Sequence, residues 1–225
     1  MTKKLTKKKN LSQPVDIRDR DTGVGWLYTD IVKDHFFNPR KFMRSGEEDN
    51  FKFNGLGRVG SPACGDEMVI WIMVDPTTER IQDCRWRTFG CGSAIASTSI
   101  LAEMITEKGG MKLDKALNLR PQDILERLGG LPDRKVHCSV LGDKALQAAI
   151  NDYFRNTKQH ERVITTGAKV IDKKLNITDR DIEEAVLEGA RDLQEVQKKL
   201  KVGVGDPEAV PQIEELIRFY LEKYF

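Results

Sequence analysis

The chain has few of the side chains with which proteins bind metals, and it lacks the spacing of a compact metal site. Its 225 residues include four cysteines and three histidines, and no two cysteines are arranged as Cys-x-x-Cys. This absence argues against a zinc finger and a bacterial ferredoxin, which take ligands from closely spaced cysteines. The formal net charge of +2 is also low, which argues against nucleic-acid binding as the main function.

Long apolar segments are absent as well. No run approaches the ~20 residues of a membrane-spanning helix, and no apolar segment follows the N-terminal lysines as a signal peptide requires. We therefore predict no membrane contact and a cytoplasmic location, where cysteines serve as ligands or reactive thiols more often than as disulfides. The lysine-rich start predicts a disordered basic lead-in over residues 1–24.

The apolar pattern over residues 25–156 predicts an α+β domain. Apolar residues around Phe51 and Phe53, over 68–74 and over 81–89 predict a small three-stranded antiparallel sheet with one side open to water. Helical spacing predicts a helix from about Leu27 to Asn38, and further helices over 94–105, 121–128 and 139–154. Strands first and helices afterwards indicate that the two pack on each other.

After a linker at residues 157–162, residues 163–225 predict a small all-α domain. Residues 178–181 (TDRD) form a capping box that opens a helix. Three apolar stripes at helical spacing follow: Ile182, Ala185 and Val186; Leu193, Val196 and Leu200; and Ile213, Leu216, Ile217 and Tyr220.

Three of the four cysteines lie in short segments, at residues 62–66 (PACGD), 89–94 (FGCGSA) and 136–139 (VHCS). Cys91 directly precedes a predicted helix, and Cys138 precedes one that we expect to open at Ser139. Unpaired amides and the helix dipole at those places favour the thiolate form. Cys64 lies in a loop that can expose its thiol. Thiolates bind zinc, iron or iron–sulfur clusters, so the three cysteines predict an open metal site built from loop ends.

Two neighbouring side chains are candidates for the fourth ligand. Asp66 offers a carboxylate oxygen, whose bond to iron is labile, and His137 offers a ring beside Cys138. By contrast, Cys84 shares a strand face with Trp86 and is predicted to pack in the core. His35 and His160 have no ligand motif around them and are predicted to be structural.

Three glycines in the pattern Gly55-x-Gly57-x-x-Gly60 match the dinucleotide-binding fingerprint. The fingerprint requires a helix directly afterwards, whereas this segment continues into Ser61-Pro62. We therefore reject nucleotide binding and predict that the glycines let a loop fold closely over the metal site.

Residues 55–66 (GLGRVGSPACGD), 88–99 (TFGCGSAIASTS) and 131–139 (LPDRKVHCS) resemble, in order, the cysteine motifs of the iron–sulfur cluster scaffold family called IscU or the amino-terminal domain of NifU. The resemblance runs from about Leu27 to Asn156 and implies the same α+β fold. It implies that the site residues are Cys64, Cys91 and Cys138 with Asp66 or His137. It also implies that Cys138 accepts sulfur as a persulfide, that Lys135 controls access, and that Tyr28 takes part in sulfur reduction; aromatic packing is the alternative role for Tyr28.

Residues 163–225 resemble the small helical domain of bacterioferritin-associated ferredoxin, which follows the scaffold domain in NifU proteins. Four cysteines hold a [2Fe–2S] cluster in that domain, and their places are taken here by Asp172, Lys174, Asp206 and Ala209. Lysine and alanine cannot replace a thiolate ligand, so we predict a domain without a cluster.

The resemblance implies a scaffold and carrier, not an enzyme. It implies that the protein accepts sulfur from a cysteine desulfurase, electrons from a ferredoxin and iron from a donor. It would build a transient [2Fe–2S] cluster and transfer it to apo iron–sulfur proteins. Residues 131–135 differ at two of five positions from the family's Leu-Pro-Pro-Val-Lys element, which argues against recognition by an Hsp70/J-type chaperone.

Alternatives remain open at the level of sequence. Zinc is an alternative occupant of the isolated protein, and a zinc-bound sulfurtransferase is the alternative function. A purely structural zinc module is a third interpretation, against which Asp66 and the open three-loop site count. A site completed within one chain and a site shared in a homodimer are both compatible with three cysteines.

Overall fold

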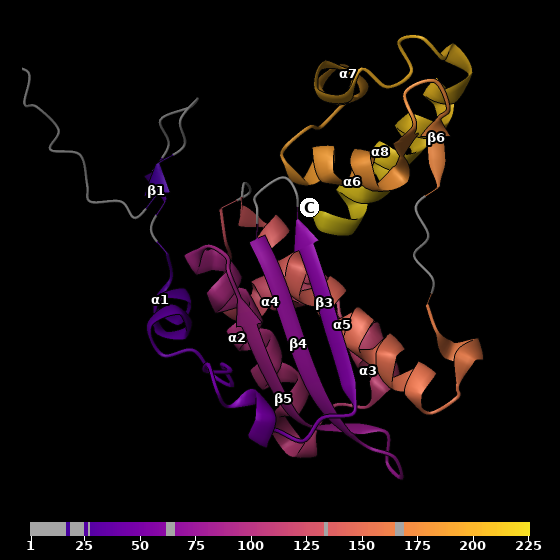
Figure 1. Ribbon diagram of the computed structural model, residues 1–225. Helices are drawn as coiled ribbons and strands as arrows, with labels where there is room; N and C mark the ends of the chain where they lie inside the picture. Colours follow the sequence, from indigo (N-terminus) through magenta and orange to yellow (C-terminus); the bar gives the residue numbers. More distant parts are fainter. Residues whose placement is uncertain (1–16, 19–24, 27, 62–65, 133–134, 165–168) are drawn as a thin grey trace, which may run out of the picture.

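The structure is a computed structural model that describes residues 17–18, 25–26, 28–61, 66–132, 135–164 and 169–225 (Figure 1). At seven of these positions it describes the backbone alone: Ile17, Arg18, Gly25, Trp26, Ser61, His137 and Cys138. Most of the predicted lead-in therefore lies outside the described residues. The exception is β1 (Ile17–Arg18), which pairs with β2 (Gly25–Trp26) in a short antiparallel contact.

The sheet of the first domain contains β3 (Gly55–Ser61), β4 (Asp66–Asp75) and β5 (Arg80–Thr88) in the order β3-β4-β5. Both pairings are antiparallel, which confirms the predicted sheet type. In β5, Cys84 and Trp86 are fully buried, as the alternation in the sequence predicts. Their partners across the ladder, Ile72 and Ile70 of β4, are buried on the same face.

The second face of the sheet is covered at its centre, so the prediction that this side is open to water is wrong there. Val69 and Trp71 of β4 are 6% and 8% exposed, and they pack with Met43 and Phe51. Met43 reaches this place because its N–H donates to the carbonyl oxygen of Trp86 at 2.8 Å along the free edge of β5. Phe51 thus covers the sheet instead of belonging to a strand.

The first strand of the sheet is the glycine-rich segment and not the predicted segment around Phe51 and Phe53. A Cβ atom on Gly57 would lie 2.0 Å from the carbonyl oxygen of Ala145 in α5 (His137–Asn156). Only a residue without a side chain lets a strand and a helix approach this closely. The predicted role of the glycines in a loop over the metal site is therefore wrong. The rejection of the dinucleotide motif is confirmed, because the next element after β3 is strand β4.

Helices cover the other face of the sheet (Figure 1). α2 (Gly92–Thr106) and α5 lie against it, α1 (Asp30–Phe37) packs on α2, and α3 (Leu113–Leu117) and α4 (Pro121–Leu128) complete the layer. The predicted helices are confirmed, with α1 ending at its C-cap Asn38. Two details differ: α3 is additional, and α5 begins at His137 instead of Ser139. None of the helices in the described residues has both the length and the apolar character of a membrane span.

Residues after α5 stay attached to the first domain through polar contacts. Arg162 of η4 (His160–Arg162) forms ion pairs with Glu79 at 2.5 Å and with Asp114 at 3.0 Å. The N–H of Ile164 donates to Asn151 Oδ1 at 2.9 Å. These contacts hold residues 162–164 against the same sheet-and-helix layer that α5 belongs to.

The C-terminal domain consists mainly of helices, as predicted, with a short antiparallel strand pair in addition. Its elements are β6 (Val170–Asp172), β7 (Ile177–Thr178), α6 (Asp179–Leu187), α7 (Leu193–Leu200), η5 (Pro207–Ala209) and α8 (Val210–Tyr224). The capping box is confirmed: Asp181 N donates to Thr178 Oγ1 at 3.4 Å, and Thr178 N donates to Asp181 Oδ2 at 2.7 Å. Ile182 and Val186 of α6 and Ile213 of α8 are fully buried in the core of this domain.

Candidate metal centre

The start of α5 lies at the end of the sheet where β3 finishes. Gly55 lies against Ala149 of α5, and Gly57 lies against Ala145, so the strand and the helix run in opposite directions. Ser61 lies four residues beyond Gly57, about 13 Å farther along the strand. The same distance along the helix is about nine residues, which leads back from Ala145 to the first turn of α5. The segment that carries Cys138 therefore meets the end of β3.

The start of β4 brings the second cysteine segment to the same place. Ser61 pairs with Asp66 across the ladder, so the first segment is anchored on both sides of residues 62–65. The N–H of Cys91 lies 3.4 Å from Asp66 Oδ2, within hydrogen-bond reach of the carboxylate. A Cβ atom on Gly90 would lie 2.9 Å from that same oxygen, so glycine is what lets the carboxylate approach the Cys91 backbone. The structure thus brings Asp66 and Cys91 together.

Cys91 occupies the N-cap position of α2, as the sequence predicts. Its carbonyl oxygen accepts the N–H of Ile95 at 3.1 Å, and the residue as a whole is half-buried. The positive end of the α2 dipole and the unpaired amides of the first turn lie beside it. A negatively charged thiolate is stabilised at such a position, and this site is accessible enough for it to react or bind a metal.

Tyr28 reaches the first turn of the same helix. Its hydroxyl oxygen lies 2.9 Å from Ser93 Oγ, and Ser93 is buried two residues after Cys91. The Tyr28 ring also packs against the main core. Tyr28 therefore lies beside the Cys91 segment and has a packing role as well.

The third cysteine segment forms the entrance to α5. Lys135 N donates to the carbonyl oxygen of Pro132 at 2.6 Å, and Val136 is the N-cap and is 3% exposed. Ser139 Oγ donates to the carbonyl oxygen of Val136 at 2.7 Å. Cys138 lies inside the first turn of α5, so the prediction that it precedes the helix is wrong by two residues.

Three of the candidate ligands lie wholly or partly outside the described residues. Cys64 and the side chains of His137 and Cys138 lie outside the part of the chain that the structure describes. Among the described residues, no three histidine, cysteine, aspartate or glutamate side chains converge as a metal site. The described geometry therefore shows two features of the site: the three backbone segments lie at the same end of the sheet, and Asp66 contacts Cys91.

Two of the residues predicted to be structural, Cys84 and His35, are buried, whereas His160 is exposed. Cys84 is fully buried, and burial raises the pKa of its thiol to about 12, so it stays protonated. His35 is 4% exposed, its Nδ1 lies 2.8 Å from Ser99 Oγ, and burial lowers its pKa. His160 lies in η4 on the chain segment that follows α5.

A contact beside the third cysteine segment was not anticipated from the sequence. Val136 and Val140 are buried in the hydrophobic core of the C-terminal domain, together with residues of α6 and α8. Their four-residue spacing does predict one covered helical face. Nothing in the sequence indicates that the cover comes from a segment about 40 residues farther along the chain.

The fold and the site define a class: an α+β domain that gathers cysteine-bearing segments at one end of a small antiparallel sheet. The family model described as "NifU-like N terminal domain" matches residues 27–160. The chain belongs to this family.

Curated relatives extend the match. The "Iron-sulfur cluster assembly scaffold protein IscU" of Aquifex aeolicus is 49% identical over 131 residues, which is 58% of this chain and 78% of the relative. The "Nitrogen fixation protein NifU" of Nostoc sp. is 37% identical over 196 residues, covering 86% of this chain and 64% of that protein. This second match is longer than residues 27–160, so it includes sequence outside the family domain.

Among solved structures, the chain is similar to a NifU-like N-terminal protein from Brucella abortus. The TM-score is 0.44 at 15% identity, covering 56% of this chain and 94% of that one. The fold assignment above depends on the strands and helices themselves.

Proposed function

We propose that this protein is a scaffold on which an iron–sulfur cluster is assembled and from which it is passed on. The observation that carries the proposal is the convergence of three cysteine-bearing segments at one end of the sheet, with the Asp66 carboxylate 3.4 Å from the Cys91 amide. Membership of the NifU-like family and the 49% identical relative named as an IscU scaffold support it. The cluster is cargo, and the protein is a carrier without turnover of its own.

The ligands we propose are Cys64, Cys91 and Cys138, with Asp66 or His137 completing the site. Thiolates bind iron firmly, whereas a carboxylate oxygen is exchanged more easily. One labile ligand beside three strong ones suits a site that must hold its cargo and then release it. The position of Cys91 at a helix N-terminus supports its thiolate form.

Three further roles follow the family resemblance. Cys138 is the proposed acceptor of sulfur as a persulfide, and Lys135 is the proposed residue at its entrance. Tyr28 is proposed to assist sulfur reduction, which its 2.9 Å contact with Ser93 beside Cys91 supports. The partners would be a cysteine desulfurase, an electron-donor ferredoxin and apo iron–sulfur proteins, whereas the altered residues 131–135 argue against an Hsp70/J-type chaperone.

We propose a [2Fe–2S] cluster as the assembled species and zinc as an occupant of the protein as isolated. A zinc-bound sulfurtransferase is not favoured, because the relatives named above are a cluster scaffold and a nitrogen fixation protein. Elemental analysis for zinc in the isolated protein and absorption spectroscopy after reconstitution distinguish the two functions.

The test is anaerobic incubation of the full chain with iron, a sulfide source and a cysteine desulfurase, followed by absorption spectroscopy. The charge-transfer bands of a [2Fe–2S] centre are expected in the parent protein and lost in Cys64→Ser, Cys91→Ser and Cys138→Ser. Cys84→Ala is the matched control and should keep the spectrum, because Cys84 is fully buried away from this end of the sheet. A parent protein that retains only zinc and never develops the bands would overturn the proposal.

A further inference from the structure

The C-terminal domain packs on the first turn of α5, the segment that carries Cys138. Val136 and Val140 are 3% and 2% exposed, and both belong to the hydrophobic core that contains Ile182, Val186 and Tyr224. In sequence, Cys138 lies midway between the two valines. The apolar contact between the domains is thus centred on the turn that holds the third cysteine.

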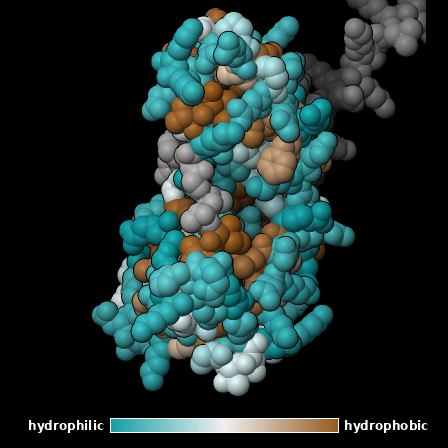
Figure 2. All heavy atoms as spheres, turned by 90° about the vertical axis from the view of Figure 1, so that its right-hand side faces the viewer, coloured by the Kyte–Doolittle hydropathy of each residue, from teal (hydrophilic) through white to brown (hydrophobic). Residues whose placement is uncertain are grey.

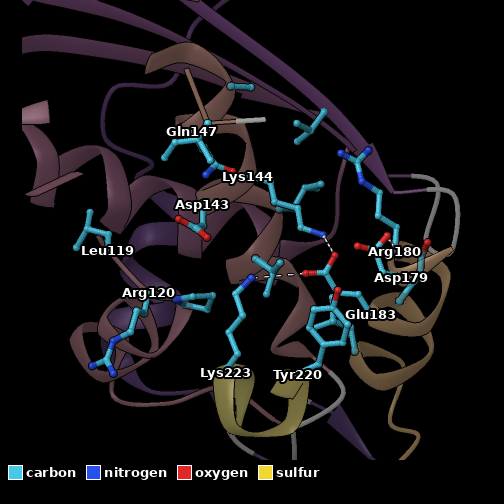
Figure 3. A pocket seen from close by; sticks show the side chains of 18 of the residues that line it. Leu119, Arg120, Asp143, Lys144, Gln147, Asp179, Arg180, Glu183, Tyr220 and Lys223 are labelled. Atoms are coloured by element: carbon cyan, nitrogen blue, oxygen red, sulfur yellow. Dashed lines mark hydrogen bonds and ion pairs between the residues drawn. The ribbon is translucent and has the colours of Figure 1, made fainter. Parts of the chain in front are cut away.

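A buried ionic cluster reinforces the contact one turn farther along α5 (Figure 3). Glu183 of α6 is 6% exposed, and its Oε2 accepts a hydrogen bond from Lys144 Nζ of α5 at 2.6 Å. Its Oε1 accepts a hydrogen bond from the Tyr224 hydroxyl and lies 3.7 Å from Lys223 Nζ, both on α8. Burial by itself would raise the pKa of Glu183, but Lys144 and its other partners outweigh burial and lower it. Of these three partners, only Lys144 comes from the first domain.

α4 adds to the contact through Leu125, which packs on the C-terminal core, and through a hydrogen bond from Gln122 Nε2 to the carbonyl oxygen of Lys223. Beside these contacts the boundary between the domains holds a cleft of about 1640 Å³, which separates α5 and β3 on one side from α6 and α8 on the other. Figure 2 shows hydrophobic side chains in the hollow between the two lobes, with polar side chains around it. Domains of one chain are expected to move relative to each other unless the interface between them is large and hydrophobic.

We propose that the docked C-terminal domain is a positioning element for Cys138, and that its release destabilises the bound cluster. This inference rests on the proposed scaffold function and assigns a regulation to the same site. Docking holds Val136 and Val140 and thereby keeps the first turn of α5 helical, with Cys138 at a fixed place relative to Cys91. Undocking exposes both valines, lets that turn fray, and weakens one of three thiolate ligands. A helical domain without cluster ligands of its own then still controls how long the neighbouring cluster persists.

The test removes the ion pair between the domains in the full chain. In Lys144→Gln, Glu183→Gln and the double variant, hydrogen exchange of the amides in residues 136–144 should rise by about tenfold. The half-life of the assembled cluster in the presence of an iron chelator should fall several-fold. The double variant should show the same exchange rate and cluster half-life as Glu183→Gln alone, because Lys144→Gln and Glu183→Gln remove the same Lys144–Glu183 ion pair. Lys144→Arg keeps the charge and should behave like the parent.

Lys199→Gln is the matched control. Lys199 pairs with Glu188 at 2.9 Å within the C-terminal domain, so its loss removes an ion pair without touching α5. The Lys199→Gln variant should show the same hydrogen exchange over residues 136–144 and the same cluster half-life as the parent. All measurements are made well below the thermal midpoint of each variant, so that global unfolding does not contribute.

The outcomes separate the two proposals. A parent protein that assembles no cluster refutes the scaffold function. A parent that assembles one, with variants unchanged in exchange or unchanged in cluster half-life, refutes the positioning role and leaves the scaffold function intact. The positioning role is supported by faster exchange together with a shorter cluster half-life in Lys144→Gln and Glu183→Gln, but not in Lys199→Gln.

Discussion

Asp66 in the first domain and Asp172 in the C-terminal domain each stand beside a loop, but their surroundings differ. From the described residues, Asp66 Oδ2 accepts a long hydrogen bond, 3.4 Å from Cys91 N, and the residue is half-buried. Asp172 is fully buried and accepts three backbone hydrogen bonds, from Lys174 at 2.9 Å, Leu175 at 3.0 Å and Gly203 at 2.9 Å. Within the described residues, one carboxylate thus accepts a single hydrogen bond, whereas the other accepts three.

Asp172 links the turn after β6 to the loop after α7. Lys174 adds a second link through a hydrogen bond from its Nζ to the carbonyl oxygen of Gly205. The amide of Gly203, followed by that of Leu175, lowers the pKa of Asp172, so the carboxylate stays charged and keeps its hydrogen bonds. Asp172 and Lys174 stand at positions where the resemblance places cluster ligands. A carboxylate and an ammonium group thus join these two loops.

The end of the first domain is held differently, by packing from outside. Gly57 lets α5 press against β3, and Val136 and Val140 are covered by the C-terminal domain. Neighbouring elements thus position the backbone around the cysteine-bearing segments, whereas the loops of the C-terminal domain are joined by the Asp172 side chain itself.

The largest expected effect comes from breaking the packing that positions the first domain's loops. Gly57→Ala places a Cβ atom 2.0 Å from the Ala145 carbonyl oxygen, and backbone cannot move aside without separating β3 from α5. We expect a loss of about 3 kcal/mol or more in the free energy of unfolding, at the upper end for overpacking. Urea unfolding followed by circular dichroism measures it.

Gly60→Ala is the matched control, on the same strand. A Cβ atom there would meet only the Asp66 carbonyl oxygen, at 3.8 Å, which is ordinary van der Waals contact. Its stability should stay within about 1 kcal/mol of the parent. Equal losses in both variants would contradict the close packing of β3 on α5.

A second prediction tests whether the C-terminal loops depend on the Asp172 carboxylate. Asp172→Ala leaves three amides without their acceptor in a buried place, and the C-terminal domain should unfold at a temperature lower by several degrees. Calorimetry of the full chain measures it. Asp206→Ala is the control at another acidic position of the C-terminal domain, because Asp206 makes no side-chain cap to η5. Identical thermal profiles for the two variants would mean that Asp172 does not hold the loops.

A third prediction concerns pH at the cleft between the domains. Burial raises the pKa of Asp143 from its usual 3.8 to about 6, against the opposing effect of Lys223 and Lys144. The folded protein therefore holds a proton that the unfolded chain releases between about pH 4 and pH 6, and the stability contributed by this group falls as pH rises through that window. Asp143→Asn removes the cost of ionising this buried carboxyl, and we expect the free energy of unfolding to rise by an amount on the order of 2 kcal/mol at pH 7.5.

The same substitution should give little or no gain near pH 3, below both pKa values, where Asp143 is mostly protonated in the folded and the unfolded state. Urea unfolding at the two pH values, each compared with the parent, measures the difference. A gain of equal size at both pH values would show that the effect is not titration of this carboxyl.

The smallest expected effect concerns release of cargo. Asp66→Ala removes the carboxylate beside Cys91. The cluster should then persist longer, and its transfer to an apo-ferredoxin should be several-fold slower. Circular dichroism follows the transfer. Glu67→Ala is the control, since Glu67 points to Arg58, 3.2 Å away across the ladder. Unchanged or faster transfer in Asp66→Ala would remove Asp66 from the release step.

Much of the fold follows from local sequence patterns. The apolar run of β4, the alternation in β5 and the stripes of α2, α4, α6 and α8 specify their elements, because each must bury one face. Cys84 could be separated from the other cysteines for the same reason, since alternation places it opposite Arg85. The capping box at Thr178 identified the start of α6 from two side chains three residues apart.

Other features needed the tertiary structure. β3 has little apolar pattern, because its glycines are selected by contact with Ala145 and Ala149, which lie about 90 residues away in the sequence. The alternation of Phe51 and Phe53 with polar residues predicts a strand. In the structure Phe51 is apolar because it covers Trp71, not because it pairs with a neighbouring strand. α5 starts two residues before Ser139, and the cover over Val136 and Val140 at its start comes from the C-terminal domain, a contact that the local sequence does not indicate.

The sequence by itself determined which residue types are available at the candidate site: three cysteines in short polar or glycine-rich segments, an aspartate after the first and a histidine before the third. It also determined that the C-terminal domain lacks thiol ligands. Only the tertiary structure decided that Asp66 meets Cys91, that Asp172 accepts three backbone hydrogen bonds, and that the C-terminal domain packs around Cys138's helical turn. The physical reason is that side-chain chemistry is carried by each residue alone, whereas proximity and burial depend on segments that are distant in the chain.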